Sequence, residues 1–205
     1  MGGRFVRTAC GSGRLTLALP KLIDKNQPPA TAGGSDKMRK RHSLILFLTF
    51  LVAPSIFAFQ ATDWVKVAPF GGGFTVMMPG KPQEEVKPGE DFISHLFTIT
   101  TDKAIYLAAY GDYAPTIKLN VGGELVANRD NFLKALDAKL VDSKEISMDG
   151  HTGLEFTGES DQASFKSRVY LFGNRIHQIG VAVFKGKDDA ANVDRFFGSF
   201  SFTKS

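Results

Sequence analysis

One segment near the N-terminus has the three-part pattern of an export signal. A cationic start at residues 38–42 precedes the apolar run 44–52. Pro54 then breaks the apolar stretch, and Ala58 is a small residue of the kind found at cleavage sites. The sequence therefore predicts a signal peptide over residues 38–58, and with it a domain that folds outside the cytoplasm.

Two alternatives to this interpretation follow from the same segment. The apolar stretch Leu44–Phe59 is 16 residues long and is interrupted by Thr49 and Pro54, whereas a spanning helix needs about 20 apolar residues. An uncleaved anchor is therefore the less favoured alternative, and it would make the protein a membrane-surface domain. Cleavage after Ala61 is also less favoured than cleavage after Ala58, because it would place bulky Phe59 three positions before the cut.

Residues 1–37 have no sustained apolar periodicity and contain Gly, Ala and Pro in short clusters. Such a composition predicts a disordered extension. A signal peptide normally begins at the start of a chain. We therefore expect that translation starts at Met38 and that residues 1–37 are a mis-annotated extension.

Removal of the predicted signal reverses the charge of the chain, which is +4 as a whole. Nine of the 25 Lys and Arg and two of the 21 Asp and Glu precede Phe59, so residues 59–205 hold 16 basic and 19 acidic residues, a net of −3. A nucleic-acid partner thereby loses its electrostatic support. Cys10 is the only cysteine, so residues 59–205 contain neither a disulfide nor a cysteine for lipid attachment.

The segment 59–205 is long enough for a single domain with its own core. Alternating apolar residues and turn signals predict strands at 63–68, 74–78, 92–101 and 104–110, and again at 139–148, 153–158 and 164–172. Gly173-Asn174 is a two-residue hairpin signal. A three- and four-residue apolar spacing predicts a helix over 125–140, and a second helix starts near Asp188. We expect an α+β fold, a largely antiparallel sheet covered by two amphipathic helices.

Three stretches carry a resemblance to a known family. They are Gly72–Pro79, Val169–Gln178 and Phe196–Phe200, and together they resemble the pattern of exported PsbP/DcrB-like domains. Their motifs are strand starts, turns and core aromatics, which specify a fold and no site. The resemblance implies a non-enzymatic extracytoplasmic domain, and it assigns no functional residue.

Catalytic templates are not matched by this sequence. Gly80-Lys81 is followed by Pro82, which excludes a phosphate-binding P-loop. Gly158–Gln162 lacks the closing Gly of a nucleophile elbow. We therefore expect no catalytic residue and no cofactor, and we interpret the acidic segment 84–91 as a solvated loop.

Two pairs of residues are candidates for a site. His95 and His177 each alternate with apolar residues along a predicted strand, so each histidine lies on the same strand face as those residues. If the two strands lay side by side, the histidines could bind a transition metal together with a carboxylate. The alternative is that each histidine is hydrogen-bonded locally at the edge of the core. Tyr110 and Tyr113 lie close to Pro115 and are predicted to form an exposed aromatic patch for binding.

Three functions remain open at this stage. The favoured one is a non-catalytic binding or assembly module of the periplasm or extracellular space, whose partner is a protein or a small ligand of the cell envelope. The others are a metal-dependent hydrolase that uses His95 and His177, and a signal-anchored membrane-surface domain. Nucleic acid is not an expected partner.

Overall fold

A computed structural model describes residues 63–203. The predicted extension 1–37 and signal peptide 38–58 lie outside these residues. Within the described part, no helix has the length and apolar character needed to cross a membrane.

The described residues form ten strands and two helices. In chain order they are β1 (Val65–Val67), β2 (Phe74–Met78), β3 (Gln83–Lys87), β4 (Phe92–Thr100), β5 (Ala104–Tyr113), α1 (Val121–Ala135), β6 (Lys139–Met148), β7 (His151–Glu159), β8 (Ala163–Phe172), β9 (Arg175–Phe184), α2 (Ala190–Ser199) and β10 (Ser201–Phe202).

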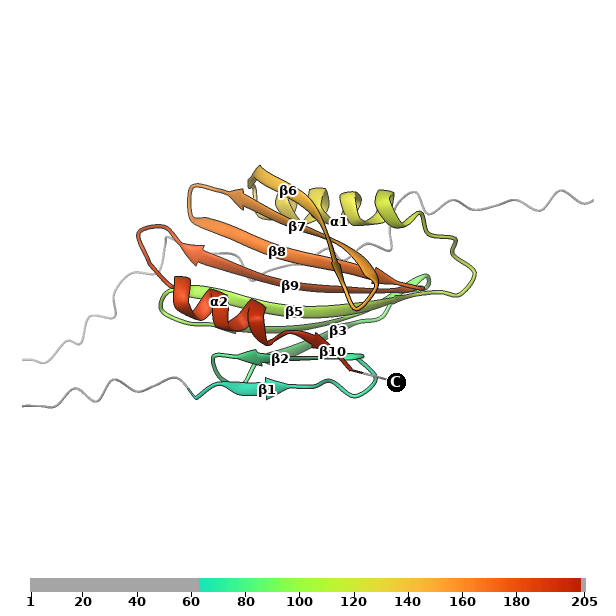
Figure 1. Ribbon diagram of the computed structural model, residues 1–205, viewed down its shortest axis with the longest axis horizontal. Coiled ribbons are helices and arrows are strands. Elements are labelled where there is room, and N and C mark those ends of the chain that lie inside the picture. Colours follow the sequence, from blue (N-terminus) through green and yellow to red (C-terminus); the bar gives the residue numbers. More distant parts are fainter. Residues whose placement is uncertain (1–62, 204–205) are drawn as a thin grey trace, which may run out of the picture. The chain divides into compact units, whose positions relative to one another are not determined.

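Seven strands form one sheet in the order β3-β4-β5-β9-β8-β7-β6, and three form a smaller sheet in the order β1-β2-β10. After β5 the chain passes through α1 to the far edge, and the β6–β9 meander then returns until β9 pairs with β5 (Figure 1). Every strand pair recorded in the two sheets is antiparallel. The predicted α+β class and the largely antiparallel sheet are confirmed.

The two-residue turn between β8 and β9 lies where the sequence predicts it. β8 ends at Phe172 and β9 begins at Arg175. Gly173 has a φ of 57°, a conformation that glycine adopts without a Cβ penalty. This turn sets the register in which Phe172 lies opposite Arg175.

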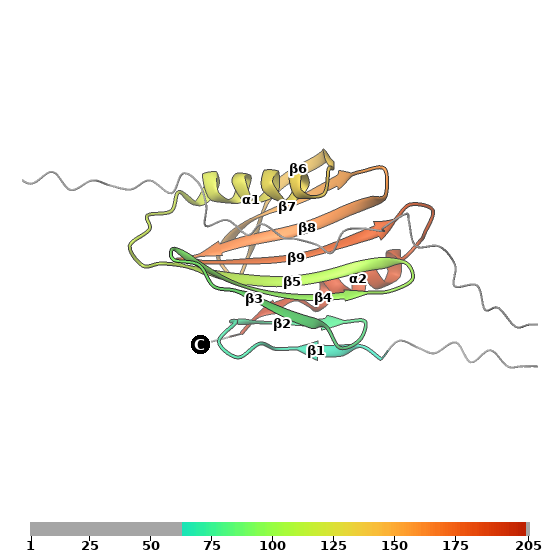
Figure 2. The same cartoon turned by 180° about the vertical axis from the view of Figure 1, so that it is seen from behind.

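Helix α1 packs on the part of the large sheet formed by β6, β7 and β8. Asn120 caps its first turn, because the side-chain oxygen accepts a hydrogen bond of 2.8 Å from the Gly123 amide. Phe132 is buried and meets Phe156 and Phe165 edge to face. These contacts fix α1 on one face of the sheet, which Figure 2 shows from behind.

Helix α2 and the three-stranded sheet lie on the opposite face. Phe196 of α2 contacts Tyr106 of β5, and the backbone amide of Met77 in β2 donates to the Ser199 hydroxyl at 2.9 Å. Tyr106 in turn donates its hydroxyl hydrogen bond to buried Asp189. An aromatic core thus fills the space between the two sheets and α2.

The structure corrects three details of the predicted elements. Residues 83–87 form the exposed edge strand β3 rather than a loop. Its backbone groups form hydrogen bonds with β4, and this pairing leaves no apolar alternation in the sequence of β3 by which the strand could be predicted. Helix α1 ends before Asp137, whose positive φ turns the chain, so Leu140 belongs to β6. The helices cover the large sheet only in part, since α1 packs on three strands and α2 packs beside β2.

Candidate functional site

Three of the four predicted site residues lie in one row across the large sheet. Tyr110 is directly opposite His95 on one side and His177 on the other, and His177 is opposite Tyr170. Directly opposite residues in antiparallel strands place their side chains on the same face. We call these four residues the histidine row, and it lies on the face that also carries α2.

His177 holds a loop in place. Its Nε2 lies 2.9 Å from the backbone oxygen of Gly72. A carbonyl can only accept a hydrogen bond, so Nε2 carries the proton and donates it. Burial lowers the pKa of His177 from 6.5 to about 4, although the bond to Gly72 acts in the opposite direction. The ring is therefore a neutral donor at neutral pH.

His95 is a neighbour of Tyr110 rather than of His177. Its ring stacks on Tyr110, with 4.4 Å between centroids and an angle of 4° between planes. Its Nδ1 is 3.7 Å from a carboxylate oxygen of Glu84, which is too long for a hydrogen bond. Because β5 separates β4 from β9, the two histidines do not meet the condition on which the predicted metal site depends.

Within residues 63–203, no group of three or more His, Cys, Asp and Glu side chains is arranged to hold a metal ion. His177 commits its Nε2 to a backbone carbonyl, and its ring packs edge to face against Phe74 and Phe202. His177 is thus hydrogen-bonded, as the alternative to a metal site expected, but its partner lies 105 positions away in the chain rather than nearby in sequence.

Arg175 joins the same loop to the sheet. Its guanidinium forms a bidentate ion pair with Asp112, through Nε at 2.6 Å and Nη2 at 2.9 Å, and Nη1 donates to the backbone oxygen of Gly71. The hydrogen bonds to Asp112 raise the pKa of Arg175. The guanidinium also lies over the Tyr110 ring, 5.2 Å from its centroid, so Arg175 is restrained from three sides.

The loop that these residues hold connects β1 to β2 and carries an exposed aromatic side chain. The Gly72 amide donates to the Pro69 oxygen at 3.0 Å and closes a turn. Gly71 and Gly73 have φ values of 72° and 75°, which favour glycine. At the tip, Phe70 has a relative exposure of 103%. The loop backbone is thus fixed while its largest side chain lies entirely in solvent.

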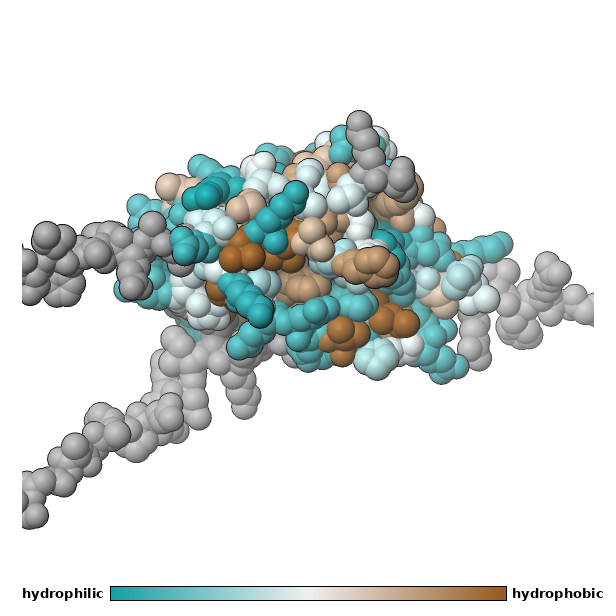
Figure 3. All heavy atoms as spheres, turned by 90° about the horizontal axis from the view of Figure 1, so that it is seen from below, coloured by the Kyte–Doolittle hydropathy of each residue, from teal (hydrophilic) through white to brown (hydrophobic). Residues whose placement is uncertain are grey.

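Two further exposed apolar side chains lie near the Arg175–Asp112 pair. Ile93 is opposite Asp112, and Phe172 is opposite Arg175, so both lie on the same face as that pair. Both side chains are exposed. We call Phe70, Ile93 and Phe172, with the ion pair between them, the Phe70 surface. Figure 3 views the molecule from the side of β1 and β2, where hydrophobic residues gather between hydrophilic ones.

The predicted exposed tyrosine patch is wrong. Tyr110 and Tyr113 are only 5% and 7% exposed, because both belong to β5, which is buried on both faces. Their odd spacing also places them on opposite faces of the strand. Tyr113 donates its hydroxyl hydrogen bond to Glu124 of α1. Among residues 63–203, the exposed aromatic side chains are those of Phe70 and Phe172 instead.

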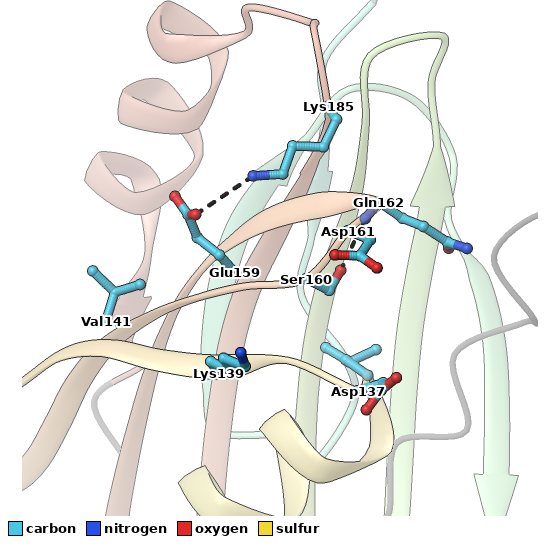
Figure 4. A pocket seen from close by; sticks show the side chains of 9 residues that line it. Asp137, Lys139, Val141, Glu159, Ser160, Asp161, Gln162 and Lys185 are labelled. Atoms are coloured by element: carbon cyan, nitrogen blue, oxygen red, sulfur yellow. Dashed lines mark hydrogen bonds and ion pairs between the residues drawn. The ribbon is translucent and has the colours of Figure 1, made fainter.

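A separate hollow lies at the other end of the large sheet (Figure 4). Its volume is about 800 Å³. In Figure 4 the Glu159 carboxylate points toward the Lys185 amino group, which lies 3.5 Å away. The lining is mainly polar or charged, comprising Leu136, Asp137, Lys139, Val141, Glu159, Ser160, Asp161, Gln162 and Lys185.

Sequence reasoning missed the Phe70 surface, although one signal was present. Phe70 stands between Pro69 and three consecutive glycines, and an apolar side chain in a turn has no strand or helix face on which to be buried. The side chains that hold the loop have no comparable signal in the sequence, because Arg175 lies more than 100 positions from Gly71.

Comparison with known proteins gives a likeness of fold. No family model matches the chain, and no curated protein matches it. The solution structure of cyanobacterial PsbP (CyanoP) from Synechocystis sp. PCC 6803 is similar at a TM-score of 0.49 and 10% identity, covering 71% of this chain and 96% of that one. A PsbP structure is thus among the solved structures to which this chain is similar.

A crystal structure from Bacteroides thetaiotaomicron VPI-5482 is similar at a TM-score of 0.34 and 18% identity. The match covers 68% of this chain and 48% of the other protein, so it spans about half of that protein's length. At these identities the likeness concerns the fold alone.

Proposed function

We propose that this protein is an extracytoplasmic binding or assembly module without catalytic activity, and that it contacts its partner through the Phe70 surface. The observation that carries the proposal is a fully exposed Phe70 on a loop whose backbone is held by Arg175 and His177. Exposed apolar side chains grouped on one surface are typical of interaction sites. The predicted export signal at residues 38–58 supports the location.

The roles of the polar groups around the loop favour binding over catalysis. Arg175 is engaged by Asp112 and by the Gly71 carbonyl, and His177 donates to the Gly72 carbonyl. A general base or nucleophile needs a free atom within reach of a substrate. Here Arg175 Nη1 and His177 Nε2 donate to the backbone of the loop, and the other ring nitrogen of His177, Nδ1, is buried, so the loop presents its apolar tip to solvent.

Location is tested by fractionating cells that produce the full chain. We expect the protein in the extracytoplasmic fraction, released from membranes by alkaline carbonate, with a mature N-terminus at Phe59 when the protein is analysed by mass spectrometry. A protein that stays in the cytoplasm with Met1 retained would contradict the location. Resistance to carbonate would favour the membrane-anchored alternative.

Binding is tested with a photoreactive benzoylphenylalanine introduced in place of Ile93 or Phe172. We expect both positions to crosslink to a protein of the cell envelope in intact cells. The matched control is Val141, which is also exposed but lies at the far end of the sheet in β6. Equal crosslinking from Val141 would contradict a partner that contacts the Phe70 surface.

A further inference from the structure

We propose that Phe70 is an anchor that inserts into an apolar pocket with a basic rim on a partner protein, and that Arg175 and His177 act as positioning residues for it. This inference rests on the proposed binding function and names the chemistry of the partner. Aromatic side chains that fill a pocket at the centre of an interface commonly carry most of its binding energy.

The loop is preorganised for such an insertion. Its backbone oxygens at Gly71 and Gly72 accept hydrogen bonds from Arg175 and His177, and its turn is closed by the bond between Gly72 and Pro69. A Cβ on Gly72 would lie 2.9 Å from Pro69 and 3.2 Å from Tyr110, so the loop packs closely against the sheet. A loop already ordered before binding loses less conformational entropy when the complex forms.

The charges at this end of the large sheet indicate the rim of the partner pocket. Glu90 and Asp91 precede β4, and Asp149 precedes β7. The starts of these strands lie at the same end of the antiparallel sheet as the start of β9, and therefore as Arg175. Arg175 is neutralised by Asp112. An apolar side chain at an end of the sheet that carries these carboxylates is complementary to an apolar pocket bordered by Lys or Arg.

Two other occupants fit the Phe70 surface less well. A loop that enters a lipid surface usually has basic residues beside its aromatic ones, since anionic headgroups attract them, and Glu90, Asp91 and Asp149 have the opposite charge. A second copy of this chain offers the hollow near Glu159 and Lys185, but its lining is mainly polar or charged. A different protein with an apolar pocket fits the anchor better.

The experiment introduces benzoylphenylalanine in place of Phe70 in the full chain, irradiates intact cells and maps the crosslinked peptide. We expect the crosslink on an apolar residue of a single envelope protein, with Lys or Arg nearby. The purified partner should then bind the Phe70→Ala variant at least about 30-fold more weakly than the unmodified protein. A lipid adduct or a crosslink to a second copy of this chain would overturn the inference.

The failure of this inference differs from that of the proposed function. Crosslinks from positions 93 and 172 without one from position 70, or unchanged affinity of Phe70→Ala, would overturn the anchor and leave the binding surface. Crosslinks from none of the three positions would overturn both.

The positioning role has its own readout. Arg175→Lys keeps the charge but loses the planar fork that holds Asp112 and the loop. We expect it to weaken partner binding several-fold when Phe70 is present and to have no further effect in the Phe70→Ala background. Arg168→Lys is the matched control, because Arg168 pairs with Glu155 on the same face and does not contact the loop. Fully additive effects of Arg175→Lys and Phe70→Ala would contradict positioning.

Discussion

Replacing Phe74 by Ala is expected to lower the free energy of unfolding by about 3–5 kcal/mol, as is usual for a large aromatic side chain lost from a core. Phe74 is 1% exposed and contacts the rings of Tyr110, His177 and Phe200. Its removal leaves a cavity between the two sheets, next to the histidine row. Phe74 also begins β2 directly after the loop that carries Phe70, so the loop should lose order as well.

The matched control is Phe70→Ala, four positions away in the same segment. Because the Phe70 side chain is fully exposed, we expect its removal to change the unfolding free energy by no more than about 0.5 kcal/mol. Urea unfolding followed by the fluorescence of Trp64, which packs on Tyr106, measures both variants. Equal losses of stability would mean that Phe70 is part of the core.

Stability is expected to fall by up to about 3 kcal/mol between pH 6.5 and pH 4 because of His177. Its pKa is lowered to about 4 in the folded protein from the ordinary value of 6.5, with burial as the main cause. Between these values the unfolded chain binds the proton more readily than the folded one, so acid favours unfolding. Above pH 6.5 the contribution of the neutral ring is fully present.

The measurement is the urea-unfolding free energy at pH 7.5 and at pH 4.5, compared with the same difference for His177→Gln. The amide of Gln can still donate to the Gly72 carbonyl but does not titrate, so we expect a clearly smaller pH dependence in that variant. Identical pH dependence in both proteins would contradict a buried neutral His177.

Glu155 becomes important only at lower pH. Burial by itself would raise its pKa, but hydrogen bonds from Arg168 and Lys144 outweigh that effect and lower it. The stability contributed by the ionised carboxylate is therefore present above its ordinary value of 4.5 and is lost as the pH falls below it. Between pH 6.5 and pH 4.5 the loss of stability comes from protonation of His177 and not of Glu155, so the two effects can be separated.

Local features of the fold were predictable because local chemistry specifies them. The Gly173-Asn174 turn follows from the freedom of glycine at positive φ. The buried side of α1, with Leu125, Phe132 and Leu133, follows from a spacing of three and four. The burial of β5 on both faces follows from a strand without polar alternation. Each of these signals is contained within about fifteen residues.

The site was predictable only in part. His95, Tyr110 and His177 were singled out from the sequence, yet the order of the strands places Tyr110 between the two histidines rather than bringing them together. The strand order depends on the α1 crossover, which sends the chain to the far edge and lets β9 return beside β5. No spacing along the chain encodes that adjacency.

Residue types and short-range periodicity were thus sufficient for the α+β class and the Gly173-Asn174 turn, and the export signal over residues 38–58 stays a prediction. The pairing of segments far apart in the chain decided which side chains meet. Arg175 and His177 reach Gly71 and Gly72 across more than 100 positions, and the burial of Tyr110 and exposure of Phe70 follow from that packing. Burial is set by which surfaces come together, because the hydrophobic effect acts on area removed from water and is independent of sequence distance.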